Sequence, residues 1–494
     1  MLCRYDIGVM AGAKLKIRKY FDLSDSEIEL LVGILNFVSA FGGLVSGKVA
    51  DYLGRKKAVA IASMVFLAGA ILMAFAQSYA MLMAGRVVTG IGVGTGLTIA
   101  PLYTAELSPK KIRGALVSFT EVSINIGILL GFLAGWAFAQ LPLEYGWRWM
   151  LGVGGIPPII IIASLVLMPE SPRWLTKNNR SHEAVMVLLK TCPPTEAFDT
   201  LLELEEQVKV PTGMTCSLRD MFCPDPTLRR LLIAGLGAAL FQQASGIEAL
   251  VYYVPEVLEA AGITDEEEQL LANAGVGAIK VMFIFIAMAF TDKAGRKTLL
   301  IASSIGMMLS DGLVALSFIL GNLAPMTITG KPTPRIITVG LACICSYMAL
   351  FSVGWGPMCW VIVSEMFPLK VRGMAAGAGT FINRIVSGTI AMSYLSMSKA
   401  LTEEGTFFLF AAVNVAAIFF VIFLVPETKG KSLEEIEASI AGKKTTSVQC
   451  CRRRARVAYD TFDRSEVYAT SAPAASLYQD IPIRNGRDGS ESSV

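Results

Sequence analysis

A basic segment reads Asp51-Tyr52-Leu53-Gly54-Arg55-Lys56-Lys57, and a shorter copy returns far downstream as Asp292-Lys293-Ala294-Gly295-Arg296-Lys297. Each copy lies between two long apolar runs and places Gly-Arg-Lys three residues after an aspartate. Short basic turns between membrane spans are typical of the cytoplasmic side. Two copies on the same side therefore predict two halves that cross the membrane in the same orientation.

Two further pairs of motifs recur in the same order. The pattern E-x-x-P-x-x-x-R-G occurs at residues 106–114 and again at 365–373, each time after an apolar run. Pro169-Glu170 and Pro426-Glu427 close the sixth and the last apolar runs. Three elements repeated in one order predict a parallel repeat about an axis normal to the membrane, as in a two-lobed transporter.

The composition indicates a membrane protein. Of 494 residues, 54% are apolar and only 17% are charged, whereas a soluble domain has about 25% charged residues. A span needs roughly 20 residues, and eleven apolar runs meet that length. They cover residues 28–48, 58–78, 80–104, 115–140, 149–168, 230–254, 268–291, 298–321, 336–364, 372–396 and 406–426.

A twelfth span, needed to pair the two halves, must precede residue 20. Only Leu2 to Ala13 is apolar there, which is about 18 Å of helix. We therefore expect the first span to be cut, without its cytoplasmic half. Arg4 and Asp6 interrupt the stretch, which disfavours a signal peptide.

These patterns predict an all-α membrane protein with two six-helix lobes. The N-terminal lobe covers 1–170 and the C-terminal lobe 229–428, joined by a cytoplasmic segment, 171–228, with helical stretches near 181–191 and 198–208. A polar tail, 429–494, begins with a possible short helix up to Ile440 and is otherwise predicted to be disordered. In it, Cys450-Cys451 precede three arginines and are either palmitoylated or part of an unmodified basic tail.

Inserting an ionisable residue into a membrane span costs about 2.5 to 3.5 kcal/mol, so each such residue requires a structural or functional explanation. Asp6 and Arg86 carry opposite charges in the first and fourth spans. A protonatable Asp6 beside Arg86 would form a switch, since protonation releases the arginine. A permanent ion pair that fixes helix packing explains the two residues equally well. Glu121, Glu248 and Lys280 are the other charged residues noted inside spans.

The seventh span carries polar groups at helical spacing. Gln242, Gln243, Glu248, Tyr252 and Tyr253 offer amides, a carboxylate and hydroxyls, which suit a ligand rich in hydroxyl groups. Hydrogen bonding between helices is the alternative. Trp355, Trp360 and Asn383 lie in the tenth and eleventh spans, where aromatic faces suit sugar C–H groups. Gly354, Gly356 and Pro357 should weaken the tenth helix.

Together these motifs resemble the sugar porters of the major facilitator superfamily, over about residues 4–437, and most of all the proton-coupled polyol and monosaccharide transporters of plants. The resemblance implies a proton site at Asp6, with Arg86 as its partner. It implies substrate contacts at Gln242, Gln243, Trp360 and Asn383, to which we add Glu121, Glu248, Tyr252 and Tyr253. It also implies a cytoplasmic charge network that holds the outward-open state: Asp51, Arg55, Glu106, Arg113, Glu170, Arg173, Asp292, Arg296, Glu365 and Arg372.

The chain departs from the family pattern at several positions. Hexose members usually have Gln at the position of Glu121 and Asn at that of Glu248, and the two carboxylates resemble the polyol-type subgroup. Lys280 occupies a position where many members have Asn, and its positive charge would balance the negative charge of one glutamate. Arg4 replaces a small or apolar residue, and Tyr52 replaces the usual arginine of the basic turn.

We therefore predict a proton symporter of polyols or monosaccharides that works by alternating access, with the proton as coupling ion and no other cofactor and no metal. The alternatives are a facilitative uniporter and a non-transporting sugar sensor that signals through its tail. The sequence carries no enzyme motif and no pattern for nucleic-acid binding. We expect a monomer in the lipid bilayer of the plasma membrane, with the vacuolar membrane as the alternative.

Overall fold

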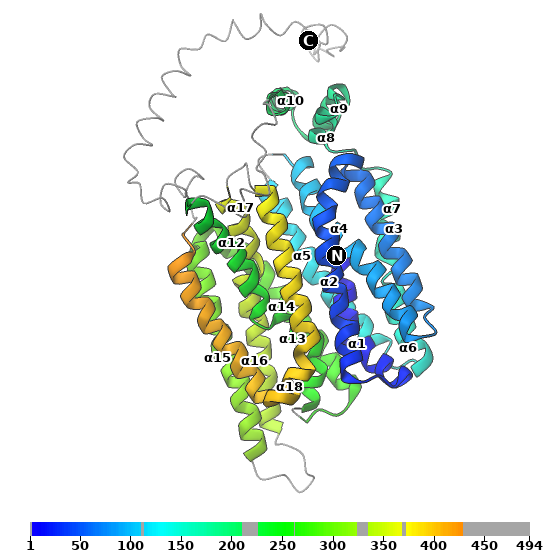
Figure 1. Ribbon diagram of the computed structural model, residues 1–494, viewed down its shortest axis with the longest axis vertical. Helices are drawn as coiled ribbons and strands as arrows, with labels where there is room; N and C mark the ends of the chain where they lie inside the picture. Colours follow the sequence, from blue (N-terminus) through cyan, green and yellow to red (C-terminus); the bar gives the residue numbers. More distant parts are fainter. Residues whose placement is uncertain are drawn as a thin grey trace, which may run out of the picture. The chain divides into compact units, whose positions relative to one another are not determined.

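A computed structural model describes residues 2–109, 113–209, 226–260, 262–323, 334–367 and 372–427 of the chain. Every regular element in these ranges is a helix (Figure 1). Residues 2–427 lie within one compact unit. The predicted helix up to Ile440, the predicted disorder and the Cys450-Cys451 pair lie outside the described residues.

The N-terminal half is built from α1 to α7. Their bounds are α1 Leu2–Phe21, α2 Asp25–Leu53, α3 Arg55–Ala74, α4 Tyr79–Leu107, α5 Arg113–Ala137, α6 Leu143–Val153 and α7 Ile156–Leu165. Three short helices follow: α8 Pro172–Lys177, α9 Ser181–Thr191 and α10 Pro194–Lys209. The last two match the two predicted helical stretches, and α8 was not predicted. They pack together through Leu175, Ala184 and Val187, with Leu107 of α4 against them.

The C-terminal half is built from α12 to α18. Their bounds are α12 Pro226–Ala244, α13 Ile247–Ala260, α14 Glu266–Ala294, α15 Arg296–Leu323, α16 Pro334–Val353, α17 Trp355–Met366 and α18 Arg372–Leu424. Among the described residues, ten stretches are long and apolar enough to cross a membrane. One of them, Met374–Leu424, contains a break at Thr402 (φ 68°) and comprises two of the eleven predicted spans.

The first helix is longer than the sequence predicted. We expected about 18 Å ending at Ala13, but α1 runs on to Phe21, which makes 20 residues, or about 30 Å. The helix continues past Ala13 because its lysine side chains contact acceptor groups elsewhere in the fold. Lys14 Nζ lies 2.6 Å from Glu256 Oε1, and Lys16 Nζ donates to the Leu141 carbonyl at 2.6 Å. In Figure 1, α1 begins near mid-height of the helix bundle and runs to one end.

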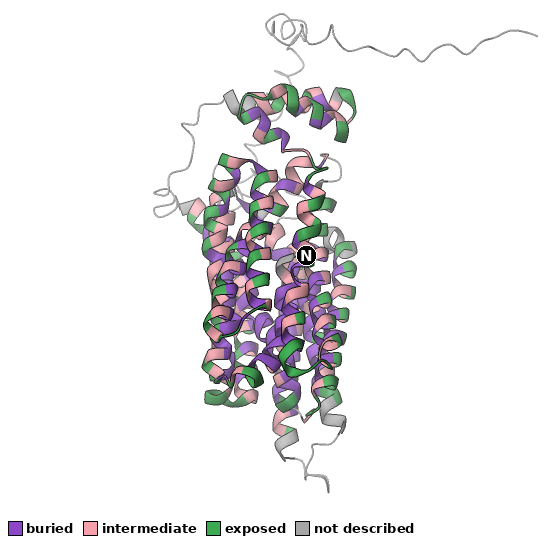
Figure 2. Ribbon diagram, turned by 90° about the vertical axis from the view of Figure 1, so that its right-hand side faces the viewer, coloured by how far each residue is buried: buried purple, intermediate pink, exposed green. Residues whose placement is uncertain are grey.

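We name the two ends of the bundle by the predicted orientation. The outer end carries the turn between α1 and α2, and the inner end carries the turn between α2 and α3. Large apolar side chains such as Phe41, Ile160, Leu167 and Phe423 are exposed along the helices between these ends. In Figure 2, exposed residues line the outer faces of the helices and buried ones gather inside. An exposed apolar belt of this kind faces lipid.

The two predicted copies of the basic turn are each followed by a helix whose first turn is capped by a glutamate. Glu170 accepts hydrogen bonds from the backbone N–H groups of Arg55 (2.9 Å) and Lys56 (3.1 Å), at the first turn of α3. Glu427 accepts from the equivalent groups of Arg296 (3.1 Å) and Lys297 (3.2 Å), at the first turn of α15. A carboxylate stabilises the positive end of the helix dipole. Each half therefore ends on a glutamate that caps the helix after its own basic turn.

Two spans of the C-terminal half, α12 with α13 and α16 with α17, contain three breaks. Gly246 has φ +94° between α12 and α13, a conformation that a residue with a side chain rarely adopts. Tyr253 is non-helical inside α13, two residues before Pro255, which cannot donate to the helix ladder. Gly354 separates α16 from α17, as the sequence predicted. At two of these breaks polar groups meet, since Gln242, just before Gly246, donates to the carbonyls of Trp355 and Gly356, just after Gly354.

Contacts between the halves run along three pairs of helices. α2 packs along α18, α5 along α14, and α1 against α13. Within the N-terminal half, α1 also approaches α5 closely. A Cβ atom at Gly131 of α5 would lie 2.5 Å from the Tyr5 carbonyl oxygen of α1. Small residues permit this close approach of two helices in a membrane.

Gly131→Ala should therefore destabilise the protein, because the added methyl meets backbone atoms of α1 that cannot rotate away. We expect a loss of about 1 to 3 kcal/mol, as for other overpacked sites, seen as a lower melting temperature of the purified protein in detergent. Gly275→Ala in α14 is the control, since its Cβ would meet nothing within 4 Å. Equal melting temperatures for the two variants would contradict the close packing of α1 and α5.

Candidate substrate pocket and proton site

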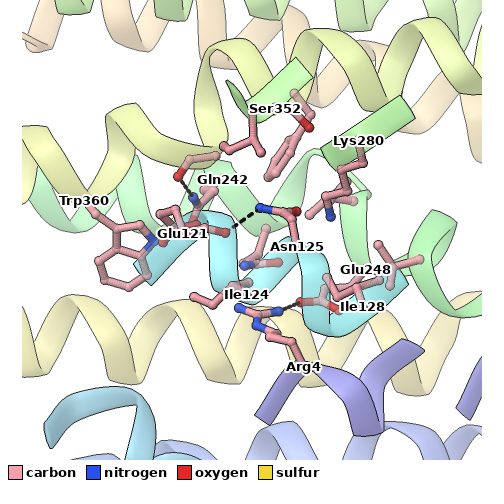
Figure 3. A pocket seen from close by; sticks show the side chains of 16 residues that line it. Arg4, Glu121, Ile124, Asn125, Ile128, Gln242, Glu248, Lys280, Ser352 and Trp360 are labelled. Atoms are coloured by element: carbon pink, nitrogen blue, oxygen red, sulfur yellow. Dashed lines mark hydrogen bonds and ion pairs between the residues drawn. The ribbon is translucent and has the colours of Figure 1, made fainter. Parts of the chain in front are cut away.

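A pocket lies between the two halves, and Figure 3 shows the side chains that line it. About 530 Å³ of space not filled by protein atoms lies within it, including space that is open to solvent. Its walls come from seven helices: Arg4 of α1; Glu121, Ile124, Asn125 and Ile128 of α5; Gln242 and Gln243 of α12; Ile247, Glu248 and Val251 of α13; Lys280 and Ile284 of α14; Phe351 and Ser352 of α16; Gly356 and Trp360 of α17.

The amides at the break after α12 are held in a network. Gln242 Nε2 donates to the carbonyls of Trp355 (2.8 Å) and Gly356 (3.0 Å), at the break that begins α17. Asn383 Nδ2 donates to Gln242 Oε1 at 2.8 Å, and Gln243 Nε2 donates to Asn383 Oδ1 at 3.1 Å. The interhelical bonding that the sequence offered as an alternative is thus present, and it fixes the two amides at the pocket wall.

A group of charges surrounds the pocket. Arg4 Nη1 lies 3.5 Å from Glu248 Oε1, as the dashed line in Figure 3 marks, and Arg384 Nη1 lies 3.9 Å from the same oxygen. Glu121 is within electrostatic range of Arg4, Lys280 and Arg384. Glu248 and Arg384 are each 2% exposed. A single glutamate therefore lies between two guanidinium groups in a site of low dielectric constant.

Several buried polar atoms at this wall have no hydrogen-bond partner among the described residues. They are Gln243 Oε1, Glu248 Oε2 and Arg4 Nε, all on side chains that line the pocket. A buried polar atom without a partner costs about 1 to 3 kcal/mol. Three side chains of the pocket wall thus carry two acceptor atoms and one donor atom whose hydrogen-bonding capacity is not used by the described residues.

Three predicted substrate contacts do not line the pocket. Tyr252 is fully buried, and its hydroxyl has no partner among the described residues. Tyr253 donates to the Ala391 carbonyl at 2.8 Å and stacks on Tyr394. Asn383 lies behind the two glutamines, as described above. Glu121, Gln242, Gln243, Glu248 and Trp360 do line the pocket. The substrate role of all eight residues remains a prediction.

Asp6 and Arg86 form an ion pair between α1 and α4, with Arg86 Nη1 on Asp6 Oδ2. Asp6 is 3% exposed and Arg86 is fully buried. Arg86 also donates to two carbonyls of α2, those of Leu31 (3.0 Å) and Val32 (3.2 Å). These two bonds would hold the guanidinium in place if Asp6 took up a proton, so a single proton changes one of three contacts.

The predicted charge network is described in its N-terminal half. Arg55 bonds to Glu106 (2.9 Å) and to Asp51 (3.1 Å) at the inner end. Glu170 caps α3 as described above, and Arg173 is exposed. The side chains of Arg113, Asp292, Glu365 and Arg372 lie outside the described residues, and Arg296 contributes its backbone N–H to Glu427. Whether these residues act together in transport stays a prediction.

Contacts across the halves gather at the outer end. Lys14 of α1 pairs with Glu256 of α13 and lies 3.6 Å from the centre of the Tyr253 ring. Glu29 of α2 accepts from the backbone N–H (2.7 Å) and the hydroxyl (2.6 Å) of Ser396 in α18. Two more pairs, Lys19 with Glu266 and Lys399 with Asp25, also join the halves. Together they close the outer end of the interface.

Sequence reasoning missed two buried charges. Arg384 directly follows Asn383 in an apolar run, and Asp311 lies in the middle of α15, 1% exposed, where it accepts a hydrogen bond from Asn414 at 2.9 Å. The rule that singled out Asp6 and Glu248, a charge inside a span, applies to both residues.

A pocket between two halves of membrane-spanning helices defines a two-lobed membrane transporter. The chain belongs to the family described as "Sugar (and other) transporter", whose model matches residues 1–439. It is therefore an integral, multi-pass membrane protein of the major facilitator superfamily, as its sequence motifs indicated.

Known relatives of the chain are plant and bacterial transporters. It is 44% identical to "Probable polyol transporter 4" of Arabidopsis thaliana, over 90% of this chain and 83% of that protein. It is 41% identical to "Polyol transporter 5" of the same plant, over 90% and 84%. Among solved structures it resembles the proton:xylose symporter XylE bound to 6-bromo-6-deoxy-D-glucose, with a TM-score of 0.73, 28% identity, and coverage of 88% and 96%. It resembles a partially occluded inward open conformation of XylE from E. coli equally well, with a TM-score of 0.73, 28% identity, and coverage of 87% and 96%.

Proposed function

We propose that this chain carries polyols or monosaccharides across the membrane together with a proton, by alternating access. The observation that supports this most directly is the pocket wall between the halves, where side chains carry buried acceptor and donor atoms that have no partner among the residues that the structure describes. A hydroxyl both donates and accepts, so a polyol satisfies both kinds of atom. The names of the polyol transporters and of the proton:xylose symporter support the same proposal, a hydroxyl-rich substrate carried together with a proton.

The proton site lies on the same helix as one pocket residue. Asp6 and Arg4 are two residues apart on α1, and Tyr252 of α13 is within electrostatic range of Asp6, Arg86 and Glu248. A proton taken up by Asp6 therefore changes the field at the wall that binds substrate. No cofactor beyond this proton enters the proposal.

The transport cycle follows from these contacts. With the outer end open, a proton neutralises Asp6 and weakens its pair with Arg86. Substrate hydroxyls bind the free atoms of Gln243, Glu248 and Arg4, and the halves then close through contacts such as Lys14 with Glu256. Substrate and proton leave at the inner end. One charge that crosses 100 mV contributes about 2.3 kcal/mol to the uphill step.

Proton-coupled current tests this function. Oocytes that express the chain should show inward current and alkalinisation of the medium when sorbitol, xylitol, inositol or glucose is added. Labelled uptake without current would establish the facilitative uniporter instead, with Asp6 and Arg86 as a structural pair. No uptake despite confirmed surface expression would contradict transport and favour the sensor. We further propose that the protein works as a monomer in the plasma membrane, which surface labelling and native mass would test.

A further inference from the structure

The charges around the pocket do not balance. Three cationic side chains, Arg4, Lys280 and Arg384, share it with two carboxylates, those of Glu121 and Glu248. The other buried ionic groups nearby are already matched in pairs, Asp6 with Arg86 and Lys14 with Glu256. One positive charge therefore remains without a counterion among the described residues of this region.

An unmatched charge in such a place is costly. Arg4, Lys280 and Arg384 are largely shielded from water, with Arg384 2% and Lys280 7% exposed, and charges removed from water are normally paired. Glu248 lies between Arg4 and Arg384 and forms ion pairs with both through the same oxygen, Oε1, at 3.5 and 3.9 Å. These are long contacts, so the single carboxylate does not saturate either guanidinium.

Two of these arginine side chains also carry hydrogen-bond donors that have no partner among the described residues. Arg4 Nε and Arg384 Nη1 have no hydrogen-bond partner among the described residues, and both are buried. A guanidinium group binds a carboxylate in a planar, two-point contact. The atoms that lack a partner are thus of the kind that recognises an anion, and they belong to the side chains that carry the surplus charge.

We propose that the pocket is selective for sugar acids, that is, polyols or sugars with one carboxylate, and that Arg4 is the residue that determines this selectivity. The inference rests on the proposed transport function and narrows its substrate class. The substrate carboxylate supplies the missing negative charge beside Arg4, while its hydroxyls meet Gln243 and Glu248 as a neutral polyol would. One monoanion taken up with one proton moves no net charge.

A matched pair of ligands tests the proposal. Sorbitol and gluconate have the same carbon chain and differ only at one terminal carbon, which is an alcohol in the first and a carboxylate in the second. Binding of each to the purified full chain is measured by calorimetry, at a pH where gluconate is ionised. We expect gluconate to bind at least about tenfold more tightly, a difference of about 1.4 kcal/mol.

The variant Arg4→Gln keeps a hydrogen-bond donor and removes the charge, so it should lower the ratio of the two affinities towards one. Arg18→Gln is the control on the same helix, since Arg18 pairs with Asp25 at 2.6 Å at the outer end, and it should leave the ratio unchanged. In transport assays, gluconate uptake should accompany proton uptake without current, whereas sorbitol uptake produces current. The comparison of the two ligands in the unaltered chain stands even if Arg4→Gln does not fold.

The outcomes separate this inference from the proposed function. Sorbitol binding that equals or exceeds gluconate binding would overturn the selectivity for sugar acids and leave polyol transport intact. A gluconate preference that persists in Arg4→Gln would overturn the role of Arg4. Binding of neither ligand to the folded, monodisperse chain would overturn the proposed function itself.

Discussion

Asp6→Asn should abolish the accumulation of substrate against its gradient while leaving exchange of substrate across the membrane. Asparagine has the shape of a protonated aspartate but cannot release a proton, so the pair with Arg86 stays permanently weakened. Without proton release at the inner end, the membrane potential and the pH gradient cannot drive the uptake of substrate. The accumulation ratio in energised proteoliposomes should fall to about one, which is a loss of the roughly 2.3 kcal/mol that each 100 mV provides.

The matched control is Asp311→Asn. Asp311 is also a buried aspartate, but it lies in the other half and bonds to Asn414 at 2.9 Å. The asparagine oxygen can accept the same hydrogen bond, so accumulation should persist. If Asp6→Asn accumulates substrate as well as the unaltered chain does, Asp6 is a structural residue and the coupling site lies elsewhere.

Arg86→Leu should have the second large effect, on stability. The change leaves the carboxylate of Asp6 buried and without a counterion, and removes the donors to Leu31 and Val32. Breaking a buried ion pair on one side costs about 3–5 kcal/mol. The melting temperature in detergent should therefore fall much further for Arg86→Leu than for Asp6→Asn.

The double variant Asp6→Asn with Arg86→Leu should recover part of that loss, since no unpaired charge remains buried. Arg180→Leu is the control for removing an arginine, because Arg180 pairs with Glu183 on the exposed surface of α9, and such pairs contribute less than about 1 kcal/mol. A double variant no more stable than Arg86→Leu would show that the lost bonds to α2, rather than the buried, unpaired charge of Asp6, cause the effect.

Sequence alone predicted the parts of the fold that depend on local pattern. The apolar runs, the two basic turns and the break at Gly354 all follow from composition and spacing. Opposite charges inside two apolar runs singled out Asp6 and Arg86, and the resemblance to sugar porters, a family that the match over residues 1–439 confirms, implied a proton site there, which stays a prediction. Part of the pocket could not be predicted this way, because its bonds join distant segments. Nothing in the sequence shows that Asn383 donates to Gln242, 141 residues earlier.

The charges on α1 show why some predictions failed. Lys14, Lys16 and Arg18 suggested that the span ended at Ala13, since cations in a membrane are costly. Their partners Glu256 and the Leu141 carbonyl lie in segments far along the chain, so the cost is offset only in the folded state. Arg384 differs from these residues, because its position inside the apolar run 372–396 is visible in the sequence itself.

The position of α1 has a mechanical consequence. On this one helix, Asp6 contacts α4, while Arg4 and Lys14 contact Glu248 and Glu256, both on α13. The helix that carries the proposed proton site is therefore also the one that touches the interrupted helix on either side of its non-helical residue, Tyr253. A small rotation of α1 about its axis would move all three contacts at once. If Asp6 takes up the proton as proposed, this event and the bend of α13 are mechanically linked through α1, and a cross-link between α1 and α13 should block transport.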